Sequence, residues 1–223
     1  GNSITTLAAD TGTVNYSQDN SLTIGTVNTT SGITASNTVL VQTTGIGSDI
    51  TLDDAVSANG TGDAIVLAAG QDFINNVVVS EVVPYALEAL NGRYLIYSTD
   101  PANDTRGELT YNFKQYNATY GVDVEGTGNG FLYSVAPTIM PGLTGTVTKT
   151  YDGDNTATLA SGNYSVSEAI DSDIVTLNNP ASGTYDNNNV GADKTVDVSG
   201  LLIVSAVNGA ATVYGYSLSS ETA

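Results

Sequence analysis

The residue types that most enzymes use for proton transfer and nucleophilic attack are missing from this chain. Its 223 residues include no His and no Cys, which excludes a Ser–His dyad, an imidazole base and thiol chemistry. Carboxylates remain, and enzymes that cleave polysaccharides use pairs of them. Asp53 and Asp54 are the candidates, but neighbours on one strand point to opposite faces and would not meet at one substrate atom. We therefore expect no catalytic residues and no enzyme, although a carboxylate pair in a cleft would revive a polysaccharide-active one.

Two short acidic segments have the oxygen ligands that Ca²⁺ accepts at close spacing. The first is Asp152-Gly153-Asp154-Asn155, and the second is the pair Asp171 and Asp173. Neither has the full twelve-residue calcium loop with a terminal Glu, and a segment rich in Asp, Asn and Gly also suits a plain turn. Metal binding stays open on the sequence alone, and no cofactor is expected.

Two further groups of side chains have both a chemical and a structural interpretation. Lys149 and Lys194 lie in strand-like runs, where a lysine can form a cross-link to Asn or Asp beside a buried acid, or can simply be solvated. The tyrosines between Tyr94 and Tyr133 could present their rings to sugars, since Tyr combines an apolar face with a polar tip. Exposed rings gathered together would favour glycan binding, whereas buried rings would favour a structural role.

The charge of the chain excludes several classes of partner. The formal net charge is −18, from 23 acidic and 5 basic residues. The basic residues are Arg93, Arg106, Lys114, Lys149 and Lys194. Nucleic-acid binding needs cations to displace phosphate counterions, so we expect no nucleic-acid partner. No apolar run approaches the ~20 residues of a membrane helix, so we expect no membrane insertion.

Composition favours an all-β protein. Thr, Ser, Asn, Gly and Val dominate, and these β-branched and turn-forming residues are typical of strands joined by short loops. The chain begins at Gly1 without a signal peptide or an initiator Met, and we expect a processed piece of a larger protein.

Apolar residues in the first third recur in pairs spaced i, i+2, which places both side chains on one face of a strand. The pairs are Leu22/Ile24, Ile33/Ala35, Val39/Val41, Ile50/Leu52, Val56/Ala58 and Ile65/Leu67. An interval of seventeen residues relates Leu22, Val39, Val56 and Phe73, and a constant interval predicts side chains stacked in one column. The pattern therefore favours a short β-solenoid of the right-handed β-helix type, with a β-sandwich as the alternative.

The rest of the chain loses this interval. We expect a solenoid segment at residues 1–80, a capping or connecting region at 81–143, and a small β-sandwich-like domain at 144–223. Within the middle region, Val77 to Val83 and Arg93 to Ser98 predict strands, while Tyr85 to Leu90 predicts a helical turn or a short helix. Pro137 to Gly142 predicts a linker or turn, and Gly145 to Thr150 predicts a strand.

Several motifs in the second half resemble a known family. Gly92 to Pro101, continued by Phe113 to Gly121, resembles the end of filamentous-haemagglutinin-like exoproteins. Thr148 to Gly153, with Gly183-Thr184-Tyr185, Asn189-Val190-Gly191 and Val198-Ser199-Gly200, is similar to the YDG-type repeat domain of those proteins. Together these segments span most of residues 92–223, and the solenoid expected at the start agrees with the β-helical shafts of the family.

The resemblance implies a two-partner-secretion adhesin that is exported through the outer membrane to the Gram-negative cell surface. The secretion domain of that family is missing here, so this route concerns the parent protein. We expect a non-catalytic stalk or spacer in cell adhesion, with neighbouring repeat domains of the same parent chain as partners. The alternatives are a carbohydrate-binding module for host or environmental glycans and a self-associating filament subunit.

Overall fold

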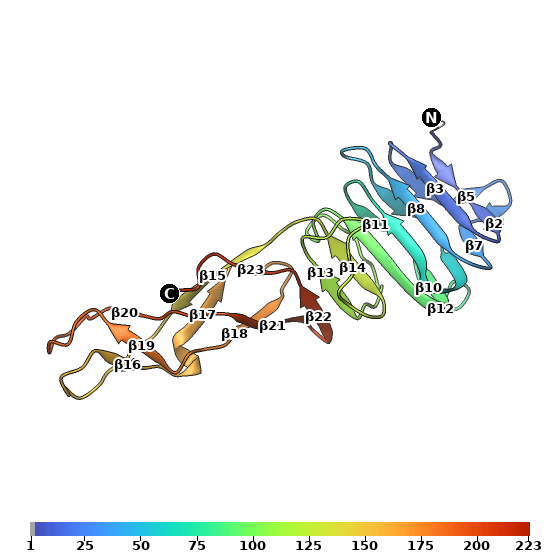
Figure 1. Cartoon of the computed structure of the whole chain (residues 1–223). Helices are drawn as coiled ribbons and strands as arrows, with labels where there is room; N and C mark the ends of the chain where they lie inside the picture. Colours follow the sequence, from blue (N-terminus) through green and yellow to red (C-terminus); the bar gives the residue numbers. More distant parts are fainter. Residues whose placement is uncertain (1–2) are drawn as a thin grey trace. The chain divides into compact units, whose positions relative to one another are not determined.

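The structure is a computed structural model that describes residues 3–223. It is all β, with 23 strands and a single short 3-10 helix, η1 (Ser161–Asn163), in the described residues. No helix in this part of the chain has the length and apolar character to cross a membrane. Contacts divide the chain into two compact units, the first ending at Val135 and the second running from Ala136 to Ala223 (Figure 1).

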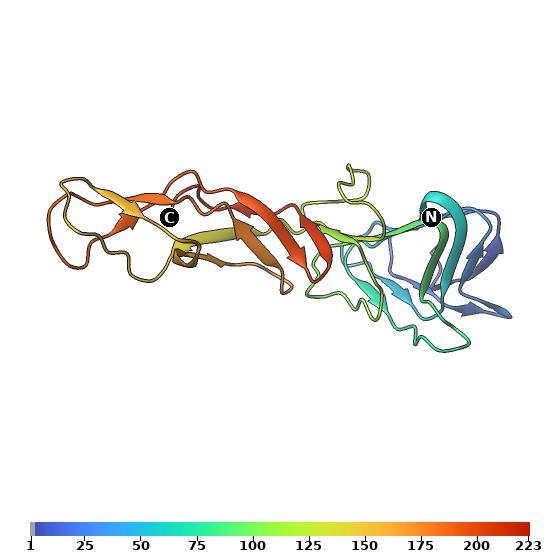
Figure 2. The same ribbon diagram turned by 90° about the horizontal axis from the view of Figure 1, so that it is seen from below.

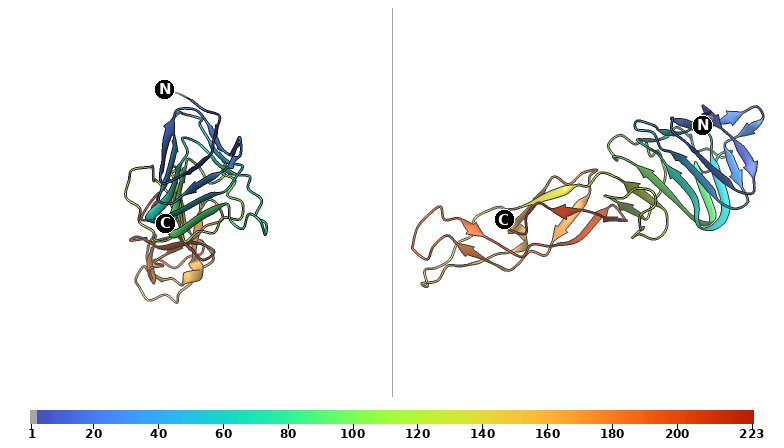
Figure 3. Two further views of the ribbon diagram at one scale, coloured as in Figure 1. Left: turned by 90° about the vertical axis from the view of Figure 1, so that its right-hand side faces the viewer. Right: turned by 45° about the horizontal axis from the view of Figure 1, so that its top comes forward.

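Three parallel ladders of strands make up most of the first unit (Figure 3). Ladder 1 consists of β1 (Thr6–Leu7), β4 (Leu22–Ile24), β9 (Ile50–Leu52) and β11 (Phe73–Asn75). Ladder 2 consists of β2 (Ala9–Thr11), β7 (Ile33–Ala35) and the first parts of β10 (Val56–Ala68) and β12 (Leu87–Ser98). Ladder 3 consists of β3 (Val14–Gln18), β8 (Val39–Thr43), the later parts of β10 and β12, then β14 (Gly130–Tyr133) and β13 (Phe113–Gln115).

The chain visits the ladders in the order 1, 2, 3 and then returns to ladder 1. The first pass consists of β1, β2 and β3, and the second consists of β4, β7 and β8. In the third pass β9 lies in ladder 1 and β10 runs through ladders 2 and 3, and in the fourth pass β11 and β12 do the same. Each pass therefore hydrogen-bonds to the passes before and after it, which satisfies the backbone groups of every inner strand.

The i, i+2 pairs point into the space between the ladders, as the sequence predicts. All twelve side chains of the six pairs are at most 4% exposed. In ladder 1, Leu22 stacks on Ile50, and Ile50 stacks on Phe73. Burying one such side chain contributes roughly 1.5–3 kcal/mol to stability, so these columns stabilise the unit substantially.

The constant interval of seventeen residues is wrong. It holds between β1 and β4, where Thr6 pairs with Thr23, but Thr23 then pairs with Thr51, twenty-eight residues later. Leu22 belongs to ladder 1, Val39 to ladder 3 and Val56 to ladder 2. Strands in all three ladders carry an inward apolar pair of the same i, i+2 pattern. The spacing between pairs along the sequence therefore does not tell which ladder a pair joins.

The corners between ladders have different lengths, and this is what removes a constant interval. Between ladders 1 and 2, one pass inserts the hairpin of β5 (Thr26–Val27) and β6 (Thr30–Ser31), and another inserts residues 76–86. Gly32 closes the hairpin corner with φ +62°, and a Cβ there would lie 2.1 Å from the Ala55 carbonyl oxygen. Only glycine fits this close approach.

Two expectations for the middle of the chain are wrong. Residues 77–83 form no strand, and Val78 and Val82 are 83% and 89% exposed. Residues 85–90 form no helix, because β12 begins at Leu87 and pairs with β10. The strand expected at Arg93 to Ser98 is confirmed as the second half of β12. β12 and β14 carry ladder 3 onward past residue 80.

The second unit is built from small three-stranded groups (Figure 2). The central strands are β15 (Thr138–Leu143), β19 (Ser182–Tyr185) and β21 (Ile203–Asn208). β15 lies between β17 (Tyr164–Ser167) and β23 (Ser217–Leu218). β19 lies between β16 (Thr156–Thr158) and β20 (Val196–Asp197). β21 lies between β18 (Ile174–Leu177) and β22 (Ala211–Tyr214). The turn expected at residues 137–142 is therefore wrong, because β15 lies there. The strand expected at 145–150 is also wrong, because these residues join no ladder.

Candidate binding groove

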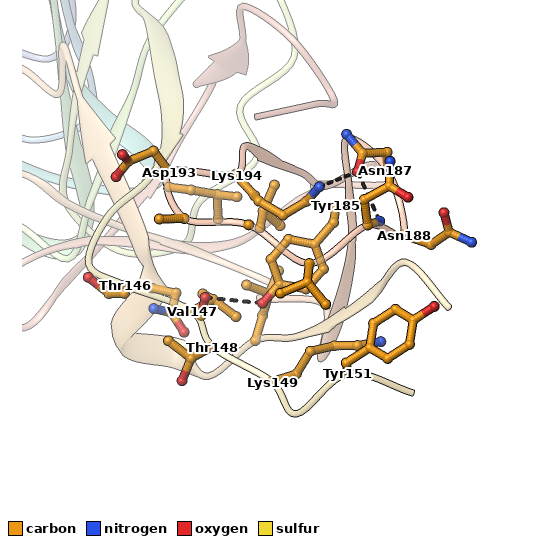
Figure 4. Close-up of a pocket in the computed structure, with 18 of the residues that line it drawn as sticks. Thr146, Val147, Thr148, Lys149, Tyr151, Tyr185, Asn187, Asn188, Asp193 and Lys194 are labelled. Atoms are coloured by element: carbon orange, nitrogen blue, oxygen red, sulfur yellow. Dashed lines mark hydrogen bonds between the residues drawn. The ribbon is translucent and has the colours of Figure 1, made fainter. Parts of the chain in front are cut away.

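An open groove of about 610 Å³ lies in the second unit (Figure 4). Its two walls are residues 143–151 and residues 185–196, which lie far apart in the sequence. At its base, Leu159, Val198 and Leu201 form a buried cluster, against which Leu143, Val147 and Val196 pack. The groove therefore has an apolar floor between two polar walls.

The first wall follows directly on β15. Its sequence, Gly145-Thr146-Val147-Thr148-Lys149-Thr150, alternates as a strand does, and Val147 turns inward to the apolar cluster. The Tyr185 hydroxyl donates a hydrogen bond of 3.0 Å to the Val147 carbonyl. Apart from this bond, the backbone of residues 145–150 has no hydrogen-bonding partner in the described part of the chain.

The second wall joins β19 to β20. Lys194 donates a short hydrogen bond to the Asn187 side-chain oxygen, and its ammonium lies 3.0 Å from Asp186 Oδ1 (Figure 4). The Asn189 N–H donates to the same Asn187 oxygen at 3.0 Å. These contacts fold the wall into an irregular, polar loop, while the backbone from Val190 to Lys194 takes no part in a described ladder.

Charge at the rim is balanced locally by Lys149. Its ammonium lies 2.7 Å from Asp152 Oδ1 and 2.5 Å from Asp154 Oδ1. The hydrogen bonds with Lys149 lower the pKa of both carboxyls, and the bonds with Asp152 and Asp154 raise the pKa of Lys149. The acidic oxygens considered for calcium are therefore turned toward a lysine.

The other acidic candidates also lie against protein partners. Asp173 is 7% exposed and accepts hydrogen bonds from Asn208 Nδ2 at 2.8 Å and from the Tyr216 hydroxyl at 3.0 Å. Asp53 and Asp54 lie in a bend after β9, so their placement on one strand was wrong. Asp53 accepts from Asn76 and Asp54 from Thr26.

Most tyrosine rings between Tyr94 and Tyr133 are withdrawn from solvent. Tyr94, Tyr97, Tyr116 and Tyr133 are at most 5% exposed, and burial raises the pKa of Tyr94 and of Tyr97 to about 12. Tyr120 is 42% exposed and packs edge-on against Tyr97. By the criterion of ring exposure, this favours a structural role for these tyrosines.

Neither lysine of the second unit has the buried acid that a cross-link to Asn or Asp needs. Asp186, beside Lys194, is 42% exposed, and the two acids beside Lys149 are more than half exposed.

A row of polar side chains, one Ser and three Asp, lies at one corner of the first unit and was missed by sequence reasoning. Ser21, Asp49 and Asp72 occupy the residue before a ladder 1 strand in successive passes. The Asp49 N–H donates to Ser21 Oγ, and the Asp72 N–H donates to Asp49 Oδ1. Asp104 extends the row and accepts from the Phe73 N–H at 2.8 Å and from the Ser98 hydroxyl at 2.7 Å. Burial raises the pKa of Asp104 to about 7.

Comparison with known families identifies the second unit. Residues 136–223 match the model of the YDG domain, so this part of the chain is a YDG domain. Neither curated proteins nor solved structures give a match to the chain. The segment Tyr151-Asp152-Gly153 turns at the rim of the groove, where Asp152 holds Lys149 and Gly153 adopts φ +85°. Tyr185 reaches across the groove to the first wall.

Proposed function

We propose that this chain is a non-catalytic structural segment of a larger secreted bacterial surface protein, acting as a stalk or spacer in adhesion. In this proposal residues of the first unit form a β-solenoid, and the YDG domain is a small β-sandwich-like module that follows it. The parent protein would be a filamentous-haemagglutinin-like exoprotein displayed on the exterior of a Gram-negative cell.

The observation that carries the proposal is the stacking of successive passes in the first unit. Each pass bonds to its neighbours through parallel ladders, and inward apolar columns run through the stack. In a stack of this kind each pass contacts only the passes directly before and after it. The stack therefore lengthens by repetition, and it resists bending. Such mechanical properties suit a spacer.

Charge and composition agree with an extracellular support. A net charge of −18 keeps neighbouring molecules apart in solution. The chain contains no Cys, so its stability depends on packing and hydrogen bonds and is independent of the redox state of its surroundings. The YDG domain supports the kinship with repeat-containing surface proteins.

Pulling single molecules by their two ends tests the spacer role. We expect the first unit to resist force and then to lengthen in several steps, because one pass can detach from the stack before the next. A substitution that empties one column, Ile50→Ala, should lower the force of these steps. Extension of the first unit in one event at very low force would contradict the proposal.

A glycan array on the intact chain tests the carbohydrate-binding alternative. Burial of the rings of Tyr94, Tyr97, Tyr116 and Tyr133 leads us to expect no saturable signal. A signal that is lost in Tyr120→Ala and retained in Tyr151→Ala would instead place a sugar site in the first unit. The reverse pattern would place it at the groove of the YDG domain.

A further inference from the structure

The excursion at residues 76–86, between ladder 1 and ladder 2, exposes a group of apolar side chains. The exposed fractions are 83% for Val78, 40% for Val79, 89% for Val82 and 55% for Tyr85. Its one charged residue is Glu81. Exposed apolar side chains that gather in one place mark a surface that contacts another molecule.

The backbone of the excursion is as open as its side chains. From Val77 to Tyr85 it makes three hydrogen bonds in the described part of the chain. Two of them close a turn, from the Ser80 N–H to the Val83 carbonyl at 2.8 Å and from the Val83 N–H to Ser80 Oγ at 3.1 Å. The third runs from the Val77 N–H to the nearby side chain of Asn75. Opening this one turn therefore releases the whole segment.

Both flanks of the excursion are fixed in the stack. On one side, the Asn76 N–H donates to the Leu52 carbonyl at 2.8 Å, and Asn76 Nδ2 donates to Asp53 Oδ1 at 3.0 Å. On the other side, Ala86 is buried, and its carbonyl accepts from the Val56 N–H at 2.9 Å. Anchors on both sides thus separate any change in the excursion from the ladders.

Three other exposed segments are closed by their own contacts. The hairpin of β5 and β6 lies at the same corner, but its two strands pair with each other. Ile46 is fully exposed, yet its turn is closed by a hydrogen bond of 3.1 Å from the Ser48 N–H to the Gly45 carbonyl. Val190 in the second wall of the groove is exposed too, but the contacts of Asn187 tie its loop together. Among these four segments, the excursion has the backbone that extends most easily.

We propose that the excursion is a proteolytic processing site, cleaved after Val78, Val79 or Val82 by an endopeptidase whose specificity pocket accepts small aliphatic side chains. Exposed loop tips are the preferred sites of proteolytic nicking, and an endopeptidase binds the cleaved segment in an extended form. The five valines within residues 77–83 favour this extended backbone, because β-branched side chains suit strands.

The reaction is the hydrolysis of one peptide bond. At Val79, the C–N bond to Ser80 breaks, water adds its hydroxyl to the Val79 carbonyl carbon and a proton to the Ser80 nitrogen, and the new carboxyl group passes its proton to the new amine. A valine side chain fits a small specificity pocket such as that of elastase. Residues 1–92 contain no Lys or Arg, so an enzyme that requires a basic side chain finds no site here.

Cleavage at this place would leave the stack assembled. β11 stays between β9 and the bridge to Thr105, and β12 stays between β10 and β14. The chain has no Cys, so non-covalent contacts alone would join the two fragments. This goes beyond the proposed function, because a spacer cut here keeps its fold at rest and comes apart under tension.

Limited digestion of the full chain with elastase, followed by intact mass, tests the proposal. We expect the first cut within residues 77–83, at a rate at least about tenfold above that of any other cut, because this segment opens without unfolding the stack. The combined variant Val78→Asp, Val79→Asp, Val82→Asp should slow this cut at least about tenfold, since a carboxylate does not suit an apolar pocket. Ile46→Asp, at another exposed residue, is the matched control and should be cut at the native rate.

The variant Ile50→Ala distinguishes a cut in the folded chain from a cut after global unfolding. It destabilises the stack, so a cut that requires unfolding would become faster in proportion, whereas a cut in the open excursion keeps its rate. A faster cut in Ile50→Ala, a first cut beside Val190, or cleavage only by an endopeptidase specific for Glu81 would overturn the proposal.

Size-exclusion chromatography of the cut chain tests whether the stack remains assembled. We expect one peak that contains both fragments, which separate only in urea. Separation of the fragments without urea would show that the ladders do not hold the cut chain together.

Discussion

At the scale of single residues, Asp104 lies in an environment that disfavours its charged form. It accepts hydrogen bonds from the Phe73 N–H and from Ser98, and it lies near Asp72 and Arg106. Desolvation raises its pKa from 3.8 to about 7, and repulsion from Asp72 adds to the rise, while both hydrogen bonds and Arg106 oppose it. The folded chain therefore binds a proton that the unfolded chain has already released between about pH 4 and 7.

Asp104 should thus make the first unit less stable as pH rises through this window. The folded state holds more protons than the unfolded state there, so the free energy of unfolding falls with increasing pH, by at most about 4 kcal/mol from this group. We expect Asp104→Asn to stabilise the unit at pH 8 relative to the native chain and to have little effect at pH 4. Urea unfolding of both chains at several pH values measures the difference.

Glu108→Gln is the control for this experiment, since Glu108 is an exposed acid of the same unit. An Asp104→Asn variant whose stability follows the native pH profile in parallel would show that Asp104 is ionised throughout the window.

Ile50 shows how strongly a single column residue supports the stack. It is fully buried between Leu22 and Phe73 in ladder 1. Truncation leaves a cavity among side chains that parallel hydrogen bonds hold in place, so Ile50→Ala should lower the free energy of unfolding by about 2–5 kcal/mol. Ile46→Ala is the matched control because Ile46 is fully exposed, and it should change stability by less than about 0.5 kcal/mol. Similar losses in both variants would contradict the column.

At the scale of elements, the register of the ladders and a constant interval of seventeen residues predict different partners for the same residue. Thr23 pairs with Thr51 in the structure, whereas an interval of seventeen places it with Leu40. Adjacent strands lie about 4.8 Å apart, within the reach of a disulfide. The double variant Thr23→Cys, Thr51→Cys should therefore close an intramolecular bond on oxidation, which intact mass detects.

The pair Thr23→Cys, Leu40→Cys is the control, and it should remain as two thiols under the same conditions. The native chain contains no cysteine, so no other bond can interfere. Closure of the control pair in place of the first would restore the interval of seventeen residues.

The sequence alone predicts which side chains are buried better than it predicts which strands are neighbours. The pair Val39/Val41 points inward as expected, because alternation along a strand is a local property. Its neighbours are Val14 and Ile65, and these depend on how many residues each corner inserts, which alternation does not encode.

The groove shows the same division between local and non-local information. Residues 145–150 have the alternation of a strand, but a strand also needs a partner at its edge, and the sequence around them does not reveal whether one is present. Asp104 was missed because its raised pKa comes from burial and from the nearby charge of Asp72, and both arise only when passes stack.

At the scale of the whole molecule, the excess of acidic residues is the dominant electrostatic feature. With 23 acidic and 5 basic residues, like charges repel throughout the folded chain, and folding brings them closer together. Raising NaCl from about 0.02 to 0.5 M shortens the screening length several-fold, so the thermal midpoint should rise. Scanning calorimetry measures it, and a midpoint that falls with salt would show that attractive pairs such as Arg93 with Asp63 outweigh the repulsion.

The unequal corners of the first unit have a practical consequence. The hairpin at residues 26–31 and the excursion at residues 76–86 leave the stack and return to it without changing which strands are neighbours. Lengthening such an excursion costs little, because loop-closure entropy grows only slowly with length. A foreign epitope inserted at either corner would therefore be presented at a fixed height along the ladders, so the protein offers graftable positions whose spacing is set by the strands and not by the inserts.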